Sequence, residues 1–335
     1  MATPRYWMGM PPDYNMRVPK SVRNCTMFIG VRILPDEIVY GGTAFLVSIP
    51  LGNAPEKVWT YLVTAKHCIE DIAKKHNGRY VIRANREDGS AAVFEAAPDF
   101  RWWEHPDDQV DAVVAEFNPS SEIWKQLDYS AVPLSDFLSA EICGNHHIGE
   151  GDEVLITGLF KQAAGRERNL PIVRSGVVAM MQDEKISHER YGPIDAHLIE
   201  VRSIGGLSGS PVFVTETIFV PLKVKSGREV RCTIPGRTFF MGSMIGHWDL
   251  PIGYDENLKK QYVNMGISMV TPATKIAEIL MRQELVAMRK EAEEEYLKSG
   301  GPTLDSGFEK PQTPQEQFTK QDFESALKKA SRKIE

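Results

Sequence analysis

Short apolar runs of strand length, separated by turn residues, fill most of the chain and constrain its fold more than any other feature. One series occupies residues 26–34, 43–49, 58–64, 79–84, 91–96 and 111–117, and a second occupies 153–158, 172–181, 196–201, 211–214, 239–245 and 264–270. Gly, Pro, Asn and Asp lie between the runs, which is typical of antiparallel barrels or sandwiches. Convincing helical periodicity is absent before the end of the chain, which argues against repeated strand–helix–strand units and a parallel sheet.

The two series predict two β units joined by a connector with Pro and Ser at 118–149. We expect an arm at 1–23, a first β-barrel at 24–135, a second at 136–270, a C-terminal helix at 271–298, and a linker with a short amphipathic helix at 299–335. The segment 216–238 is a long insertion, either a hairpin or a loop.

The end of the chain has the only helical patterns. Thr271 and Pro272 form a plausible helix start, because a capping hydroxyl precedes a first-turn proline. Further on, Phe323, Leu327 and Ile334 fall on one helical face. A short helix at 319–334 rarely stands alone in water, so it either docks on its own domain or binds a regulatory protein partner.

Charge and cysteine content exclude several classes of protein. The 39 Lys and Arg residues against 45 Asp and Glu give a net charge of −6, which argues against a nucleic-acid binder. No apolar run reaches the roughly 18 residues of a membrane span, and the start lacks the pattern of a secretory signal. Four scattered cysteines without a CxxC pair indicate reduced thiols in the cytoplasm and no metal site.

Three segments carry residues that together perform nucleophilic catalysis. Residues 62–68 (LVTAKHC) present His67 after a strand, Asp111 opens the apolar run at 110–115, and Ser208 lies in the glycine-rich turn GGLSGSPV. A serine hydroxyl is a weak nucleophile until a base removes its proton. Each residue alone has an ordinary structural interpretation, but all three in one chain place a candidate site between the two β units.

The turn around Ser208 also suits the charge that forms during attack on a carbonyl. Such an attack creates an oxyanion, which backbone N–H groups stabilise. A glycine two residues before the serine allows the chain to direct two amides at one point. The amides of Gly206 and Ser208 are therefore the candidate oxyanion hole.

These segments resemble the motifs of the trypsin/chymotrypsin-type serine peptidases. Residues 64–68 (TAKHC) are similar to Thr-Ala-Ala-His-Cys, 111–114 (DAVV) to Asp-Ile-Ala-Leu, and 206–211 (GLSGSP) to Gly-Asp-Ser-Gly-Gly-Pro. Residues 41–47 and 266–268 add further similarity, so the resemblance covers about residues 24–285. It implies an all-β fold of two antiparallel six-stranded barrels, followed in this chain by a C-terminal helix and a charged tail.

The resemblance also implies an activity, that of a serine endopeptidase acting on a protein or peptide without metal or cofactor. Ser208 would be the nucleophile, His67 the general base and Asp111 the group that orients the imidazole. Activity would then rise as His67 loses its proton, at about pH 6–7.5. Two alternatives remain: a catalytically silent or partner-activated module that binds peptides, and a hydrolase of esters or small amides.

Several positions depart from the family pattern. Leu207 replaces the aspartate that pairs with a newly cleaved N-terminus in digestive members, so we expect no activation of that kind. Cys68 lacks its disulfide partner, because Tyr40 precedes Gly41 and Gly42. Arg202 occupies the place of the aspartate of trypsin-like specificity, so a basic residue before the cut is not expected.

A different preference is suggested by the residues after the insertion. In glutamyl endopeptidases and some viral relatives, a histidine on the substrate-binding strand recognises Glu or Gln. His247 is the candidate for that role, with Arg202 as a second residue that would aid it, and the ordinary interpretation is a structural histidine next to Trp248.

Overall fold

The computed structural model describes residues 18–35, 37–76, 80–96, 100–189, 191–202, 205–223, 229–254 and 260–298. Most of the predicted arm at 1–23, and all of the linker and helix at 299–335, lie outside the described residues. Among the described residues no helix is both long and apolar enough to cross a membrane.

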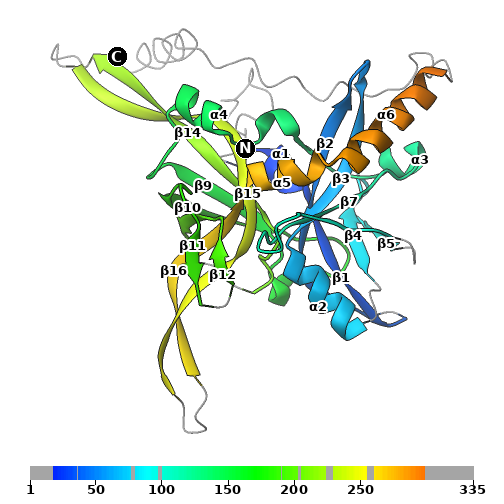
Figure 1. Cartoon of the computed structure of the whole chain (residues 1–335), viewed down its shortest axis with the longest axis horizontal. Helices are drawn as coiled ribbons and strands as arrows, with labels where there is room; N and C mark the ends of the chain where they lie inside the picture. The colour runs from blue at the N-terminus through cyan, green and yellow to red at the C-terminus, as the bar shows by residue number, and fades with distance from the viewer. Residues whose placement is uncertain are drawn as a thin grey trace, which may run out of the picture.

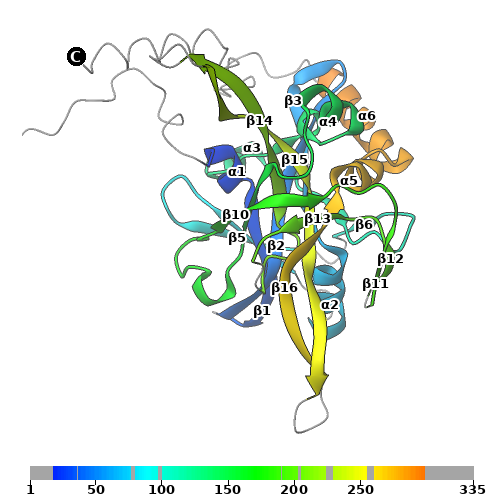
Figure 2. The same ribbon diagram turned by 90° about the vertical axis from the view of Figure 1, so that its left-hand side faces the viewer.

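Strands make up about half of the described residues, and all but one short hairpin belong to two units (Figures 1 and 2). The first is an eight-stranded sheet in the order β5 (Ala91–Glu95), β4 (Val81–Asn85), β1 (Thr26–Leu34), β2 (Glu37–Leu51), β3 (Ala54–Thr64), β7 (Val113–Glu116), β6 (Trp103–Glu104), with β8 (Val132–Pro133) beside β2. All its pairs are antiparallel except β2–β8. Its edge strands β5 and β6 are not paired with each other among the described residues, so the strand pairing of this unit is open at that point.

The second unit is a closed antiparallel barrel. Its strands follow one another around the ring as β10 (Ile172–Met180), β13 (His197–Glu200), β16 (Lys260–Pro272), β15 (Glu229–Tyr254), β14 (Pro211–Lys223) and β9 (Glu153–Gly158). A separate hairpin consists of β11 (Ile186–His188) and β12 (Gly192–Ile194). The all-β class and the C-terminal helix predicted from the sequence are confirmed.

The helices are few and most are short. They are α1 (Lys20–Asn24), α2 (Lys66–His76), α3 (Ser121–Trp124), α4 (Ala140–His146), α5 (Ala273–Leu280) and α6 (Gln283–Lys298), with 3₁₀ turns η2 (Leu134–Asp136) and η3 (Lys161–Ala163). Helix α2 begins directly after β3 and was not expected from the sequence. Its apolar residues Ile69 and Ile72, three positions apart, are buried against Val31 and Val113 of the first sheet.

The centre of the first sheet is covered on both faces. Residues 43–47 of β2 and 60–64 of β3 are buried without interruption, as expected for strands enclosed between two layers. Phe45 and Val63 contribute to one apolar cluster, while Leu46 and Leu62 contribute to another on the opposite face. This arrangement fixes β2 and β3, whose ends carry the first half of the candidate site.

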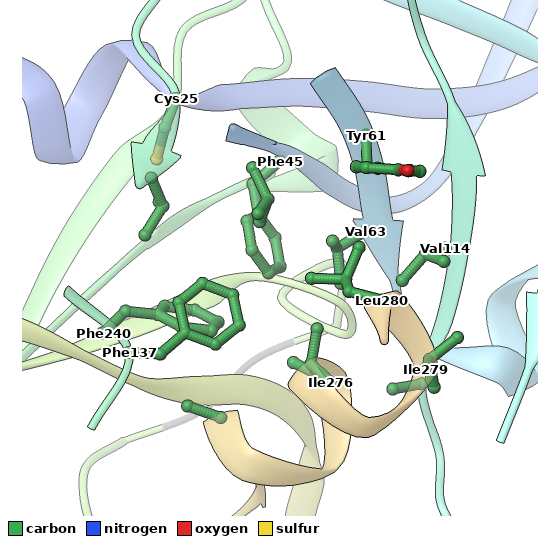
Figure 3. Close-up of a cluster of buried hydrophobic side chains, with 14 of the residues drawn as sticks. Cys25, Phe45, Tyr61, Val63, Val114, Phe137, Phe240, Ile276, Ile279 and Leu280 are labelled. Carbon is green, nitrogen blue, oxygen red and sulfur yellow. The ribbon is translucent and has the colours of Figure 1, made fainter. Parts of the chain in front are cut away.

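A shared apolar core joins the two units (Figure 3). The ring of Phe45 in β2 lies 5.2 Å from that of Phe240 in β15, and Phe240 lies 4.7 Å from Phe137. Ile276 and Leu280 of α5 close the same cluster. Because the cluster draws on both units and on the C-terminal helix, it sets the position of one unit against the other.

The C-terminal helical region differs from the expected start and extent. Thr271 belongs to β16 and its hydroxyl donates to the Asp111 carbonyl at 3.3 Å, so it does not cap α5. The helix also breaks after Leu280. Arg289 of α6 donates to the Leu280 carbonyl at 2.9 Å and to the Tyr61 hydroxyl at 2.7 Å, which ties α6 to the end of α5 and to β3.

The insertion at 216–238 is a hairpin. Beyond Thr215, β14 and β15 continue their pairing from Thr217↔Pro235 to Lys223↔Glu229, as a ribbon that leaves the barrel (Figure 1). At the other end of β15, pairing with β16 forms a second ribbon, which ends at Tyr254↔Lys260. A single strand, β15, therefore runs from one ribbon through the barrel wall into the other.

Candidate active site

His67 and Asp111 are joined by two hydrogen bonds. The Nδ1 atom of His67 lies 2.7 Å from Oδ2 of Asp111, and the His67 backbone N–H donates to Oδ1 at 2.9 Å. His67 is in the first turn of α2, and Asp111 lies just before β7, the strand that pairs with β3. The carboxylate therefore fixes both the ring and the backbone of the histidine, and it keeps the Nδ1 proton in place.

The turn of Ser208 packs against the strands that lead to His67. Gly209 has φ +77°, and a methyl group there would collide with the Thr43 carbonyl and the Thr64 hydroxyl. It would also lie 2.9 Å from the Ala65 nitrogen. Only glycine allows this approach. It places the residue next to Ser208 against Thr64 and Ala65, which lie three and two positions before His67 in the chain.

The serine and histidine side chains each have another partner. Ser208 Oγ donates to the carbonyl of Ile245 at 3.2 Å, and Nε2 of His67 lies 3.7 Å from Sγ of Cys68. Among the described residues no hydrogen bond joins Ser208 to His67. Catalytic hydrogen bonds are often long or poorly aligned without substrate and shorten when it binds.

The candidate oxyanion hole has the required backbone groups. Gly206 has φ +105°, a conformation that disfavours other residues. No backbone hydrogen bond is donated by the amides of Gly206 or Ser208 to the described residues. Both N–H groups are therefore available to an oxygen that approaches Ser208.

Leu207 lies between these two amides with its side chain in the barrel core. It is 1% exposed and packs in the apolar cluster that contains Val212 and Met244. A residue in this place has neither charge nor access to a terminal amine, which supports the expectation that N-terminal cleavage does not activate the chain.

Cys68 has no disulfide partner, but the residue that faces it differs from the expected one. A methyl group on Gly42 would lie 2.8 Å from the Cys68 sulfur, so Gly42 and not Tyr40 faces the thiol. The irregularity between Ile29 and Gly30 shifts the pairing of β1 with β2, and Tyr40 instead stacks its ring against Arg83 at 4.4 Å. Cys25, Cys68, Cys143 and Cys232 are all free.

The surroundings of His67 alter its protonation. Burial of the imidazole lowers its pKa, but hydrogen bonds and charge from Asp111, together with Cys68, outweigh burial and raise the pKa of His67 above its usual 6.5. The imidazole consequently holds its second proton to a more alkaline pH than the sequence alone suggested.

No hydrogen bond or ion pair joins the two candidate specificity residues in the described part of the chain. Arg202 is exposed and makes no ion pair with described residues. His247 lies on β15, and its Nε2 is 3.1 Å from Oδ2 of Asp249. The residue paired with His247 across the sheet is Ser268, which is fully buried and whose hydroxyl has no partner among described residues. The sequence analysis includes Ser268 only in the similarity of residues 266–268 and gives it no role, because its place opposite His247 depends on strand pairing.

Metal ligands do not cluster in the described part of the chain: no group of three or more His, Cys, Asp or Glu side chains lies together there. His146, which the sequence places near Cys143, instead lies 3.2 Å from the Glu216 carboxylate.

Comparisons with known proteins give structural likenesses only. No family model matches the chain, and no curated protein does. Deg5 has a TM-score of 0.45 at 15% identity, with 79% of this chain and 92% of that chain covered. The MamO protease domain of Magnetospirillum magneticum has a TM-score of 0.38 at 14% identity (64% and 93% covered), and an inactive form of Rv3671c from M. tuberculosis has 0.36 at 14% (76% and 85%). Likeness at this level does not establish a function.

Proposed function

We propose that the chain is a serine endopeptidase. Ser208 attacks the carbonyl carbon of the scissile peptide bond as His67 takes its proton at Nε2, and the amides of Gly206 and Ser208 stabilise the oxyanion. His67 then gives the proton to the leaving amine, and water releases the acyl group by the same route. Asp111 holds the imidazole in the tautomer that accepts at Nε2.

The observation that carries this proposal is the double hydrogen bond between His67 and Asp111 beside the Ser208 turn. Here one carboxylate holds both the ring of His67, through Nδ1, and its backbone N–H. The other ring nitrogen, Nε2, has only a weak contact, at 3.7 Å from Sγ of Cys68. Such an arrangement prepares a base and leaves its accepting atom for a substrate-bound serine.

An open strand edge supports a peptide as the substrate. β14 pairs with β15 only as far as Pro211↔Ser243, while β16 continues along the opposite edge through Gly246↔Met269 and His247↔Ser268. Residues 246–248 thus lack a strand on one side among the described residues. A peptide added there as an antiparallel strand would have its backbone groups paired, and the Ile245 carbonyl that now accepts from Ser208 would receive a substrate N–H.

A partner-activated or silent module is the second candidate. It is favoured by the Ser208 hydroxyl, which donates to Ile245 and not to His67. While Ser208 donates to Ile245, its proton is not passed to His67. A partner or substrate whose N–H donates to the Ile245 carbonyl would displace the Ser208 hydroxyl from it. The helix at 319–334 lies outside the described residues, and a regulatory partner that binds it remains a proposal.

Cleavage of unfolded protein tests the two candidates directly. We expect the wild-type chain to cut a denatured protein or a peptide library, with products identified by mass spectrometry, and Ser208→Ala to give none. Binding of the same peptides without cleavage by the wild type would favour the module over the enzyme.

The free state of all four cysteines supports a reducing compartment, and we propose the cytoplasm.

The residue before the cut is proposed to be Glu or Gln. The Asp249 carboxylate orients His247 through Nε2, and Nδ1 remains for a substrate side chain near the unpaired Ser268 hydroxyl. We expect His247→Ala to lower kcat/KM for Glu and Gln peptides by about 10–100-fold and to change little for Leu peptides. A library that shows no preference for Glu or Gln, or an unchanged profile for His247→Ala, would contradict this assignment.

The pH profile follows from the raised pKa of His67. Only the neutral imidazole accepts the serine proton, so activity rises with pH through the titration of His67 and is suppressed below it. Because Asp111 and Cys68 raise this pKa, we expect the midpoint of kcat/KM to lie above pH 6.5. Cys68→Ala removes one of the two causes and should move the midpoint to lower pH. A midpoint at or below 6.5 in the wild type, or no shift in the variant, would contradict the account.

A further inference from the structure

Thr43 connects the first sheet to the turn that carries Ser208. It lies on β2 and is fully buried. Its hydroxyl donates to the Gly206 carbonyl at 3.1 Å and accepts from the Leu159 N–H at 2.9 Å, while its backbone N–H donates to the Ser208 carbonyl at 3.0 Å. One residue of the first unit thus binds both carbonyls on either side of Leu207.

These bonds determine which way the peptide groups of the turn face. A peptide unit is planar, so the held carbonyls of Gly206 and Ser208 also fix the N–H groups of Leu207 and Gly209, which point the opposite way. The Ser208 N–H belongs to the peptide unit between these two fixed units, so its direction is restricted from both sides. With the Gly206 and Ser208 carbonyls both held by Thr43, neither can turn into the space where an oxyanion would form. The φ of +105° at Gly206 is a conformation that needs such support, because glycine by itself is free to leave it.

The segment that begins at Leu159, whose N–H donates to the Thr43 hydroxyl, also packs against Gly206. A methyl group on Gly206 would lie 2.8 Å from the Leu159 carbonyl and 3.0 Å from the side chain of Lys161, so the glycine rests on the start of the β9–β10 connection. Thr43 therefore fixes the turn twice, once by direct bonds and once through the segment beneath it.

The far end of the same connection is anchored to the first sheet as well. Arg83 of β4, which is 6% exposed, donates from Nε to Asn169 Oδ1 at 2.6 Å and from Nη2 to the Ala164 carbonyl at 2.8 Å and the Gly165 carbonyl at 3.0 Å. The segment from Leu159 to Asn169, which packs against Gly206, is consequently held at both ends by the first unit. These bonds do not depend on a charge at Leu207.

We propose that Thr43 is the positioning residue of the oxyanion hole, with its hydroxyl as the bridge that sets the conformation of residues 206–208. The first β unit thereby holds the hole in shape without a charged partner at position 207. The catalytic consequence rests on the proposed function, whereas the effect on the turn does not.

The test compares three variants of the full chain. Thr43→Val keeps the shape and removes the hydroxyl, Thr43→Ser keeps the hydroxyl, and Thr157→Val is the matched control. Thr157 is also fully buried in a strand, but its hydroxyl has no partner among described residues. Loss of one oxyanion donor costs about 10²–10³ in kcat. We expect Thr43→Val to lower kcat by about 100-fold with KM changed less than about threefold, and Thr43→Ser and Thr157→Val to stay within about threefold of wild type.

Amide hydrogen exchange over residues 205–210 gives a readout that needs no activity. We expect exchange in this segment to become at least about tenfold faster in Thr43→Val and to stay unchanged in the other two variants. Unchanged exchange and unchanged kcat in a folded Thr43→Val would overturn the proposal. A wild type without activity would refute the proposed function alone, and exchange would then decide the role of Thr43. Thr43→Ala, which also lacks the hydroxyl, replaces Thr43→Val should that variant not fold.

Discussion

Asp111→Asn is expected to lower kcat/KM by about 10⁴-fold at neutral pH while the chain stays folded. The carboxylate accepts from both the His67 backbone N–H and Nδ1, at 2.9 and 2.7 Å. An amide offers one oxygen and one NH₂ group, so its NH₂ would face one of these two donors. If the backbone bond keeps the oxygen, Nδ1 must become an acceptor and the ring proton moves to Nε2, which can then no longer accept from Ser208.

Asp107→Asn is the matched control for this prediction. Asp107 belongs to the same segment and accepts from the Gln109 N–H and from Lys185, but it does not touch His67. We expect its activity to stay within a few-fold of wild type, since exposed ion pairs contribute little. If Asp111→Asn kept more than a tenth of the wild-type kcat/KM, Asp111 would not be the orienting acid.

Gly209→Ala is the second substitution with a large expected effect, here on stability. The new methyl group would meet the Thr43 carbonyl, the Thr64 hydroxyl and the Ala65 nitrogen, two of which are backbone atoms that cannot turn away. Backbone strain at φ +77° adds to this overlap. Each effect costs about 1–3 kcal/mol, so we expect the free energy of unfolding to fall by about 2–6 kcal/mol, measured by urea denaturation.

Gly205→Ala is the control that shows whether the loss of stability in Gly209→Ala is specific to Gly209 or common to any added methyl group in this turn. A methyl group on Gly205 would have no neighbour within 4 Å, and the residue is exposed. Its free energy of unfolding should remain within about 0.5 kcal/mol of wild type. Equal losses in both variants would mean that the packing of Gly209 against the first unit does not hold the site together.

Strands were predictable from sequence where their apolar pattern is local. The runs at 26–34 and 153–158 coincide with β1 and β9, and the core of β2, β3, β10, β13 and β16 was also located. The ribbon of β14 and β15 was predicted only as one of two alternatives, a hairpin or a loop, and the ribbon of β15 and β16 beyond His247 was not located, because the residues of each ribbon pair only with each other. The closed second barrel follows from pairings such as Val177↔Glu200, which no single segment reveals.

Helix α2 was missed for a different reason. It has only 11 residues, and its start carries Lys66 and His67 directly after a strand, which resembles a turn. Its helical character depends on burial of Ile69 and Ile72 against the first sheet, a tertiary effect that outweighs the local pattern.

The candidate site was located in part. His67, Asp111 and Ser208 could be named because each lies in a local motif. Thr43 could not be given its role, because the two groups that its hydroxyl bridges lie 116 and 163 residues away in the chain. The same holds for Gly42, whose place opposite Cys68 depends on an irregularity in strand pairing.

Reaction with a fluorophosphonate, followed by intact mass, tests the central claim most directly, because such a reagent phosphonylates only a serine that a base has activated, with loss of fluoride. The account predicts one adduct on the wild-type chain, and none on Ser208→Ala or His67→Ala under the same conditions. An adduct that persists in Ser208→Ala, or a folded wild type that forms none at any pH up to 9, would contradict the assignment of Ser208 and His67 as nucleophile and base.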